Sequence, residues 1–180
     1  TDTLQGYSAS YEFGNDVLNG VGGDDELFAF RGADTLDGGS GNDVIRAGNG
    51  KDLMVGGSGE DIMYGGFGFN TFVDEMDGEP DKLYLKSDQL AYNWIYEKAG
   101  NSPNGEKADK IGMLDSIDKI YIQGATTSQL SFVDGVSHTT PFGDVLRGVG
   151  IYASGTLEAV FTGGNLSQSQ LQAMTFGADA

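Results

Sequence analysis

The stretch from Tyr11 to Val73 reads YEFGNDVLN GVGGDDELF AFRGADTLD GGSGNDVIR AGNGKDLMV GGSGEDIMY GGFGFNTFV. It consists of seven consecutive units of nine residues, with no insertion between them. The fourth position is Gly in every unit, the sixth is Asp in six units and Asn70 in the last, and the eighth is a large apolar residue. The consensus is G-G-x-G-x-D-x-U-x, where U is apolar. A strict period of this kind predicts a repeat architecture.

Each unit predicts one tight turn and one short strand. Gly at the first, second and fourth positions permits positive φ and close backbone approach. Positions seven to nine predict a three-residue strand in which only the eighth side chain points inward. Because such a strand cannot bury its apolar side chain alone, the units must stack as a solenoid. With two units per coil of eighteen residues, Leu18, Leu36, Met54 and Phe72 line one inner sheet, and Leu27, Ile45 and Met63 line the other.

The same geometry collects the sixth-position residues into two columns. One column holds Asp16, Asp34, Asp52 and Asn70, and the other holds Asp25, Asp43 and Asp61. Neighbouring strands lie about 4.8 Å apart, and two like charges at that separation repel by roughly 3–4 kcal/mol at an effective dielectric of about 20. Cations between the coils would remove this repulsion. A solvated acidic face, with Asp supporting turns, explains neither the register nor the cost of stacking.

Composition narrows the class of ligand. The chain has 27 acidic and 10 basic residues and a formal net charge of −17, so it lacks the basic patches that nucleic acid or an anionic membrane would need. It has no Cys and a single His, which suits Zn²⁺ and Cu²⁺ poorly. Carboxylate and carbonyl oxygens are what Ca²⁺ takes, six to eight at a time, whereas Mg²⁺ keeps its waters. No apolar run is long enough to predict a membrane span.

Residues 11–73 resemble the repeats-in-toxin (RTX, haemolysin-type) nonapeptide array of proteins exported by type I secretion. The resemblance implies an all-β fold, a right-handed parallel β-roll with one Ca²⁺ between each turn and the turn two units later. In the family, one turn supplies its Asp and the carbonyl oxygens of positions two and four. The stacked turn supplies its own Asp and the carbonyl oxygens of positions one and three.

Carried onto this sequence, the resemblance implies four good calcium sites and one weak site. The best-matching pair of turns gives Gly39, Gly41 and Asp43 with Gly56, Ser58 and Asp61, and the pair before it gives Val21, Gly23 and Asp25 with Gly38, Ser40 and Asp43. The other column pairs Asp16 with Asp34, Asp34 with Asp52 and, as the weak site, Asp52 with Asn70, with carbonyl ligands that include Gly32, Gly48, Asn49 and Gly50. Tyr11-Glu12 and Ala29-Phe30 replace the Gly-Gly pair, which makes the first site of this column the next weakest.

The sequence on either side of the repeats predicts caps. Residues 1–10 do not fit the repeat and predict a degenerate cap or the remnant of an upstream coil, with Tyr7 and Ala9 at the sixth and eighth positions. Residues 74–180 predict a mostly β capping region that packs on the roll of residues 1–73. Within it, residues 81–87 and 118–124 alternate between apolar and polar residues, which predicts strands that extend the sheets of the roll.

Later segments of this region carry clearer signals. Residues 149–152 and 156–161 predict a hairpin across Ser154-Gly155. A hydrophobic staple and a capping box around Ser167 and Gln170 predict a short C-terminal helix over residues 168–174. Residues 90–98 fit a strand or a helix, and the alternation of their aromatic residues favours the strand.

No catalytic motif accompanies the repeats, so the sequence predicts no enzyme. H-E-x-x-H, G-x-S-x-G and the P-loop are all absent. His138 is the only His, and we expect it in a surface loop. Tyr92, Trp94 and Tyr96 alternate and could stack on a sugar ring, although packing at the end of the roll is the preferred interpretation.

The sequence therefore predicts a calcium-dependent folding and stabilising module of a secreted protein, located outside the cell or on its surface. The resemblance further implies that the flank contains a region recognised by the type I secretion machinery. The alternatives are a surface anchor or adhesin that binds polysaccharide or cell-surface glycan, and the non-catalytic tail of a secreted enzyme.

Overall fold

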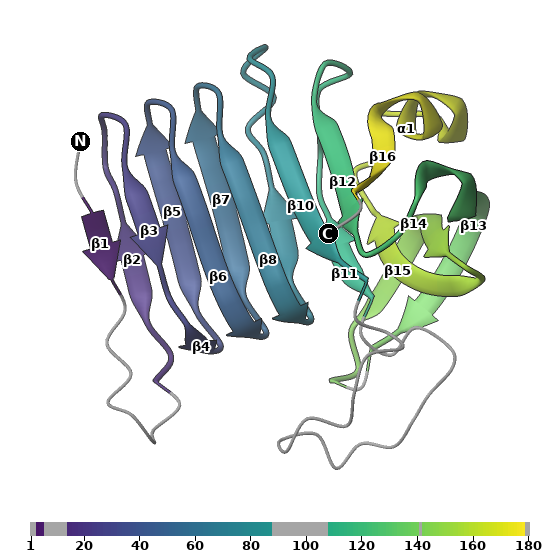
Figure 1. Cartoon of the computed structure of the whole chain (residues 1–180), viewed down its shortest axis with the longest axis horizontal. Helices are drawn as coiled ribbons and strands as arrows, with labels where there is room; N and C mark the ends of the chain where they lie inside the picture. The colour runs from purple at the N-terminus through teal and green to yellow at the C-terminus, as the bar shows by residue number, and fades with distance from the viewer. Residues whose placement is uncertain (1–2, 6–13, 88–107, 141, 179–180) are drawn as a thin grey trace.

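The computed structural model describes residues 3–5, 14–87, 108–140 and 142–178, which form two facing sheets (Figure 1). The first sheet runs β1 (Thr3–Gln5), β3 (Glu26–Phe28), β6 (Val44–Gly50), β8 (Ile62–Gly68), β10 (Lys82–Lys86), β12 (Lys119–Gln123) and β16 (Thr175–Ala178), with β4 (Arg31–Gly32) beside β6. The second runs β2 (Val17–Asn19), β5 (Thr35–Ser40), β7 (Leu53–Ser58), β9 (Thr71–Val73), β11 (Asp109–Ile111), β15 (Thr156–Phe161), β14 (Val145–Ala153) and β13 (Leu130–Thr139).

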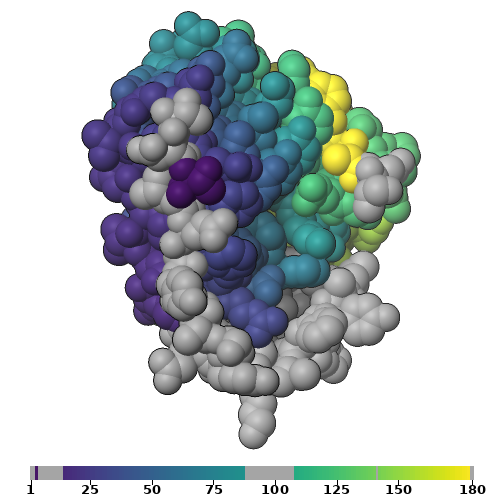
Figure 2. Space-filling model, turned by 60° about the vertical axis from the view of Figure 1, so that its left-hand side comes forward, coloured from purple at the N-terminus to yellow at the C-terminus, as the bar shows by residue number. Residues whose placement is uncertain are grey.

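Strands of the repeats alternate between the two sheets, so two units complete one coil. Leu36 lies opposite Met54 in the second sheet, and Ile45 lies opposite Met63 in the first, each pair eighteen residues apart in parallel register. The predicted parallel β-roll with an eighteen-residue coil is confirmed. Figure 2 shows the coils as successive bands from purple to teal in chain order.

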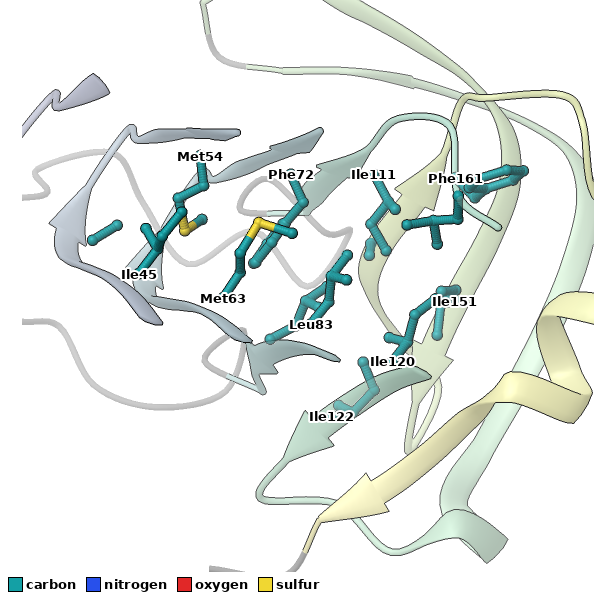
Figure 3. Close-up of a cluster of buried hydrophobic side chains, with 14 of the residues drawn as sticks. Ile45, Met54, Met63, Phe72, Leu83, Ile111, Ile120, Ile122, Ile151 and Phe161 are labelled. Atoms are coloured by element: carbon teal, nitrogen blue, oxygen red, sulfur yellow. The ribbon is translucent and has the colours of Figure 1, made fainter. Parts of the chain in front are cut away.

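The core is the narrow space between the sheets, filled by the eighth-position side chains (Figure 3). Each of these side chains is at most 5 % exposed. The two predicted rows are both present, and each continues beyond the repeats, through Ile111 and Phe161 in the second sheet and through Leu83 and Ile120 in the first. Apolar contact along these rows holds the sheets together.

Central strands of the roll are longer than the three residues predicted. β5 to β8 have six or seven residues each, because the Gly-rich start of the next unit continues the pairing. Gly39 lies opposite Gly57, and a Cβ placed on Gly57 would lie 1.9 Å from the Gly39 carbonyl oxygen. Only Gly permits coils to approach so closely, and Gly57 also has a φ of 104°.

Both sheets continue past Val73 without a break. The predicted strands at residues 81–87 and 118–124 are present as β10 and β12, and both extend the first sheet in parallel register. β11 and β15 extend the second sheet. At the other end, Leu4 rather than Ala9 pairs with Leu27, which agrees with the expectation that residues 1–10 do not fit the repeat. Tyr7 and Ala9 lie outside the described residues.

The C-terminal elements close the far end of the roll. The predicted hairpin is present as β14 and β15, which are antiparallel across Ser154-Gly155. The predicted helix is α1 (Gln168–Met174), with Ser167 as N-cap and Gln170 completing the capping box. His138 is half-buried within strand β13, so its placement in a surface loop was wrong. The segment at residues 90–98, including Tyr92, Trp94 and Tyr96, lies outside the described residues.

Aromatic side chains form a row on the outer face of the first sheet. Tyr84 stacks between Tyr64 and Tyr121, with ring centroids 4.6 and 4.8 Å apart, and Tyr121 meets Phe176 at 5.8 Å. The Arg46 guanidinium lies 4.6 Å from the centroid of the Tyr64 ring. This row stabilises the pairing of β6, β8, β10, β12 and β16 across the end of the repeats. None of the helices in the described part of the chain could span a membrane.

Candidate metal centre

A ladder of Asp side chains runs up each edge of the roll, at the point where the turn passes into the strand. The Oδ1 atom of each Asp accepts a hydrogen bond from the backbone N–H of the Asp one coil earlier. In one column Asp43 Oδ1 accepts from Asp25 at 2.7 Å, and Asp61 Oδ1 accepts from Asp43 at 2.8 Å. The other column repeats the pattern from Asp16 through Asp34 and Asp52 to Asn70, at 2.7, 3.0 and 3.4 Å.

The second oxygen of four of these carboxylates lacks a hydrogen-bond donor. Oδ2 is buried in Asp34, Asp43, Asp52 and Asp61 and accepts no hydrogen bond within the described part of the chain. No described basic side chain pairs with these four carboxylates either. A buried charged oxygen without a partner is costly. A divalent cation at this atom would supply the missing partner, so the donor set fits such an ion.

Backbone carbonyl oxygens face the same spaces. A Cβ placed on Gly38 would lie 2.6 Å from the Gly56 carbonyl oxygen and would collide with Asp43 Oδ2. A carboxylate oxygen and a carbonyl oxygen from adjacent coils therefore converge beside Gly38, where a side chain would block them. Only oxygen atoms are offered, which is the set that Ca²⁺ prefers.

Several of the predicted carbonyl ligands also accept backbone hydrogen bonds within the roll. The Ser40 carbonyl accepts from the Gly23 N–H at 2.6 Å, and the Ser58 carbonyl accepts from the Gly41 N–H at 2.8 Å. A carbonyl oxygen has two lone pairs. Each of these oxygens therefore keeps one lone pair available for a cation.

Electrostatics of the columns point the same way. Burial, together with the neighbouring Asp34 carboxylate, raises the pKa of Asp52 to about 7. Burial also raises the pKa of Asp61 to about 7, with Asp43 and Asp74 adding to the effect. The pKa values of Asp34 and Asp43 are raised by the same causes. Without a cation, the ionised form of these Asp carboxylates is therefore disfavoured. A bound cation would stabilise the ionised form again.

The family comparison agrees with this geometry. The model of the RTX calcium-binding nonapeptide repeat, in four copies, matches residues 12–45 and 37–72. Residues 12–72 are RTX repeats. Those repeats are a calcium-binding structural module, and the buried Asp columns are compatible with that property. No curated protein and no solved structure matches the chain.

The Asp ladders continue beyond the RTX repeats, which sequence reasoning did not foresee. Asp81 Oδ1 accepts from the Asp61 N–H at 2.7 Å, and Asp118 Oδ1 accepts from the Asp81 N–H at 3.0 Å. In the other column Asp109 Oδ1 accepts from the Asn70 N–H at 2.7 Å. A sequence signal exists, because each of these residues lies two positions before a buried apolar residue, as in the RTX repeats. No Gly-rich turn precedes these residues in the sequence, so the nine-residue consensus does not identify them.

Among the described residues, two RTX units depart from the consensus at position two. Val21 and Phe30 replace Gly there and have φ values of 72° and 73°. The structure keeps the turn at both positions, although left-handed φ is unfavourable for such side chains. The pair Tyr11-Glu12 lies outside the described residues.

Proposed function

We propose that calcium ions lie between the coils of the RTX repeats and that the chain is a calcium-dependent folding and stabilising module of a secreted protein. The observation that carries this proposal is the pair of columns of buried Asp Oδ2 atoms without hydrogen-bond donors. Such columns destabilise the fold while they are bare. They become favourable when cations bind, because each carboxylate then gains a partner of opposite charge.

Five sites follow from the pairs of stacked turns. Four are strong and have Asp on both turns, and the fifth is weak because Asn70 offers a neutral amide to Asp52. The carbonyl ligands are those of the turn positions that the RTX resemblance supplies, including Gly39, Gly41 and Gly56 in the best-matching site. Calcium would supply positive charge at these carboxylate and carbonyl oxygens. The stacked turns of the chain fix the spacing of the oxygens and bury them.

Linkage between binding and folding makes the module respond to its surroundings. When the free calcium concentration is about 100 times the dissociation constant of a site, binding at that site adds about 2.7 kcal/mol to the free energy of unfolding. Several sites together therefore decide whether the roll forms. At the low calcium concentration of the cytosol the acidic chain stays unfolded and exportable, and outside the cell it folds.

The chain's role in export and its location belong to the same proposal. The net charge of −17 favours cations over nucleic acid or anionic membranes as partners. The region after the repeats contains the segment that the type I secretion machinery recognises, and the module itself is not an enzyme. The proposal about export and location is supported by the match to the RTX repeats, because proteins with these repeats are typically secreted.

Circular dichroism with and without calcium tests the proposal. We expect little β-structure in a chelator and a β spectrum when calcium is restored, because repulsion within the Asp columns opposes folding. Magnesium at the same concentration is the control, and it should restore much less structure. An identical β spectrum in chelator and in calcium would contradict the proposal.

A further inference from the structure

Three buried carboxylates meet at the junction where the chain leaves the RTX repeats. Asp74 follows β9, Asp81 precedes β10, and Asp118 precedes β12. Each offers one carboxylate oxygen, and these three oxygens all lie within 4.8 Å of one another. The exposed fraction of Asp81 and of Asp118 is 0 %, and that of Asp74 is 3 %.

One carboxylate oxygen of Asp81 has no hydrogen-bond donor. Asp81 Oδ1 accepts from the Asp61 N–H, but Asp81 Oδ2 is buried and accepts no hydrogen bond within the described residues. Asp118 uses both oxygens, accepting from Asp81 and from Asp115 at 3.0 and 2.6 Å. Asp74 accepts from Glu75 and Met76. No described basic side chain pairs with the three carboxylates.

We propose that Asp74, Asp81 and Asp118 bind a further calcium ion, outside the RTX repeats. Ligand oxygens lie about 2.3–2.6 Å from Ca²⁺, so two ligands of one ion are at most roughly 5 Å apart. The cluster meets this limit for every pair of its oxygens. The three ligands are hard carboxylate oxygens, with no nitrogen or sulfur atom among them. This composition favours Ca²⁺ over transition metals.

The position of the site gives it a specific role. Asp81 and Asp118 are 37 residues apart in sequence but adjacent in the ladder, because β12 pairs with β10. Asp74 lies in the loop that replaces the Gly-rich turn. The ion therefore joins the end of the RTX repeats to the strand that resumes the first sheet. Closing so long a segment costs chain entropy, and the ion offsets part of that cost.

Calcium counting on the full chain tests this site. Equilibrium dialysis with metal analysis should find one tightly bound ion fewer in Asp74→Asn than in the wild type, and the same loss in Asp118→Asn. Asp74 contributes no bond to the ladder between coils, so its variant keeps the sheets paired. Glu79→Gln is the matched control, since Glu79 is an exposed acid of the same loop, and its stoichiometry should equal that of the wild type.

The outcomes separate this site from the RTX sites. Circular dichroism in saturating calcium shows whether each variant folds. If Asp118→Asn does not fold, the calcium stoichiometry of Asp74→Asn alone tests the site. Wild-type stoichiometry and affinity in a folded Asp74→Asn would overturn the site while leaving the RTX sites intact. Loss of an equal number of ions in Glu79→Gln would overturn it too. A wild-type chain that bound no calcium would contradict both this site and the proposed function.

Discussion

Asp81 Oδ1 accepts a hydrogen bond from the Asp61 N–H at 2.7 Å across 20 residues, where every earlier step of the ladder spans 18. The two additional residues lie in the loop between β9 and β10, and the ladder passes through this change unbroken. The last RTX repeat is therefore not the end of the roll. The backbone of Asp61, the last Asp of the repeats, is held by a residue that belongs to the flank.

Truncation after Val73 should damage the last coils first. It removes Asp81 and Asp109, which accept from the Asp61 and Asn70 N–H groups, and it leaves the strand edges of β8 and β9 unpaired. Exposed edges and apolar side chains such as Phe72 promote association. We expect the calcium sites nearest Asp61 and Asn70 to be lost and residues 1–73 to aggregate, as measured by calcium titration and light scattering. Cooperative folding of a monomeric 1–73 fragment would show instead that the flank is a separate module.

Asp43→Ala should weaken two calcium sites, whereas Asp16→Ala should weaken one. Asp43 stands in the middle of its column, between Asp25 and Asp61, and Asp16 stands at the end of the other. Calorimetric titration gives the number and affinity of the sites in each variant. Glu60→Ala is a control of equal charge change, because Glu60 is exposed at the fifth position of its unit. Equal losses in the Asp43 and Asp16 variants would contradict the shared-ligand arrangement.

The calcium-free chain should be more stable in mild acid than at neutral pH. Burial raises the pKa values of Asp52 and Asp61 from 3.8 to about 7 in the folded state. The folded chain therefore binds more protons than the unfolded chain between these values, and its stability falls as the pH rises through them. Circular dichroism of the metal-free chain at about pH 5 and about pH 8 compares the folded fractions, and we expect the larger β signal at about pH 5.

Calcium should reverse this dependence, because protons compete with the ion for the same carboxylates. Greater stability of the metal-free chain at the higher pH would show that the buried carboxylates do not titrate in this range.

Val21→Gly should stabilise the calcium-loaded chain by about 0.5–1 kcal/mol. Val21 has a φ of 72°, and its side chain is 75 % exposed, so replacement relieves backbone strain and removes little packing. Val17→Gly is the matched control, since Val17 is 81 % exposed but lies in strand β2. That variant should lose stability, because Gly weakens a strand. Chemical denaturation of both variants in calcium measures whether the free energy of unfolding rises in Val21→Gly and falls in Val17→Gly. A lower free energy of unfolding in Val21→Gly would mean that the turn is not strained.

Much of the roll could be predicted from sequence because its contacts repeat. An eighteen-residue coil brings Ile45 over Met63 and Asp43 over Asp61 from spacing alone, and the helix at residues 168–174 follows from local capping at Ser167. Such features depend on neighbours at fixed separations in the chain. Each repeat therefore contains enough information to position its own apolar and acidic side chains.

Tertiary structure alone decided how the Asp ladder continues beyond Val73. Asp81 and Asp118 have the same D-x-U spacing as the repeats, but their place in the column depends on pairings across 20 and 37 residues. No local pattern specifies those separations. The register of Leu4 against Leu27 likewise follows from strand pairing and not from the nine-residue period. The periodic sequence determined the coil and its Asp ladder, and long-range sheet pairing decided where the ladder ends and brought Asp74, Asp81 and Asp118 together.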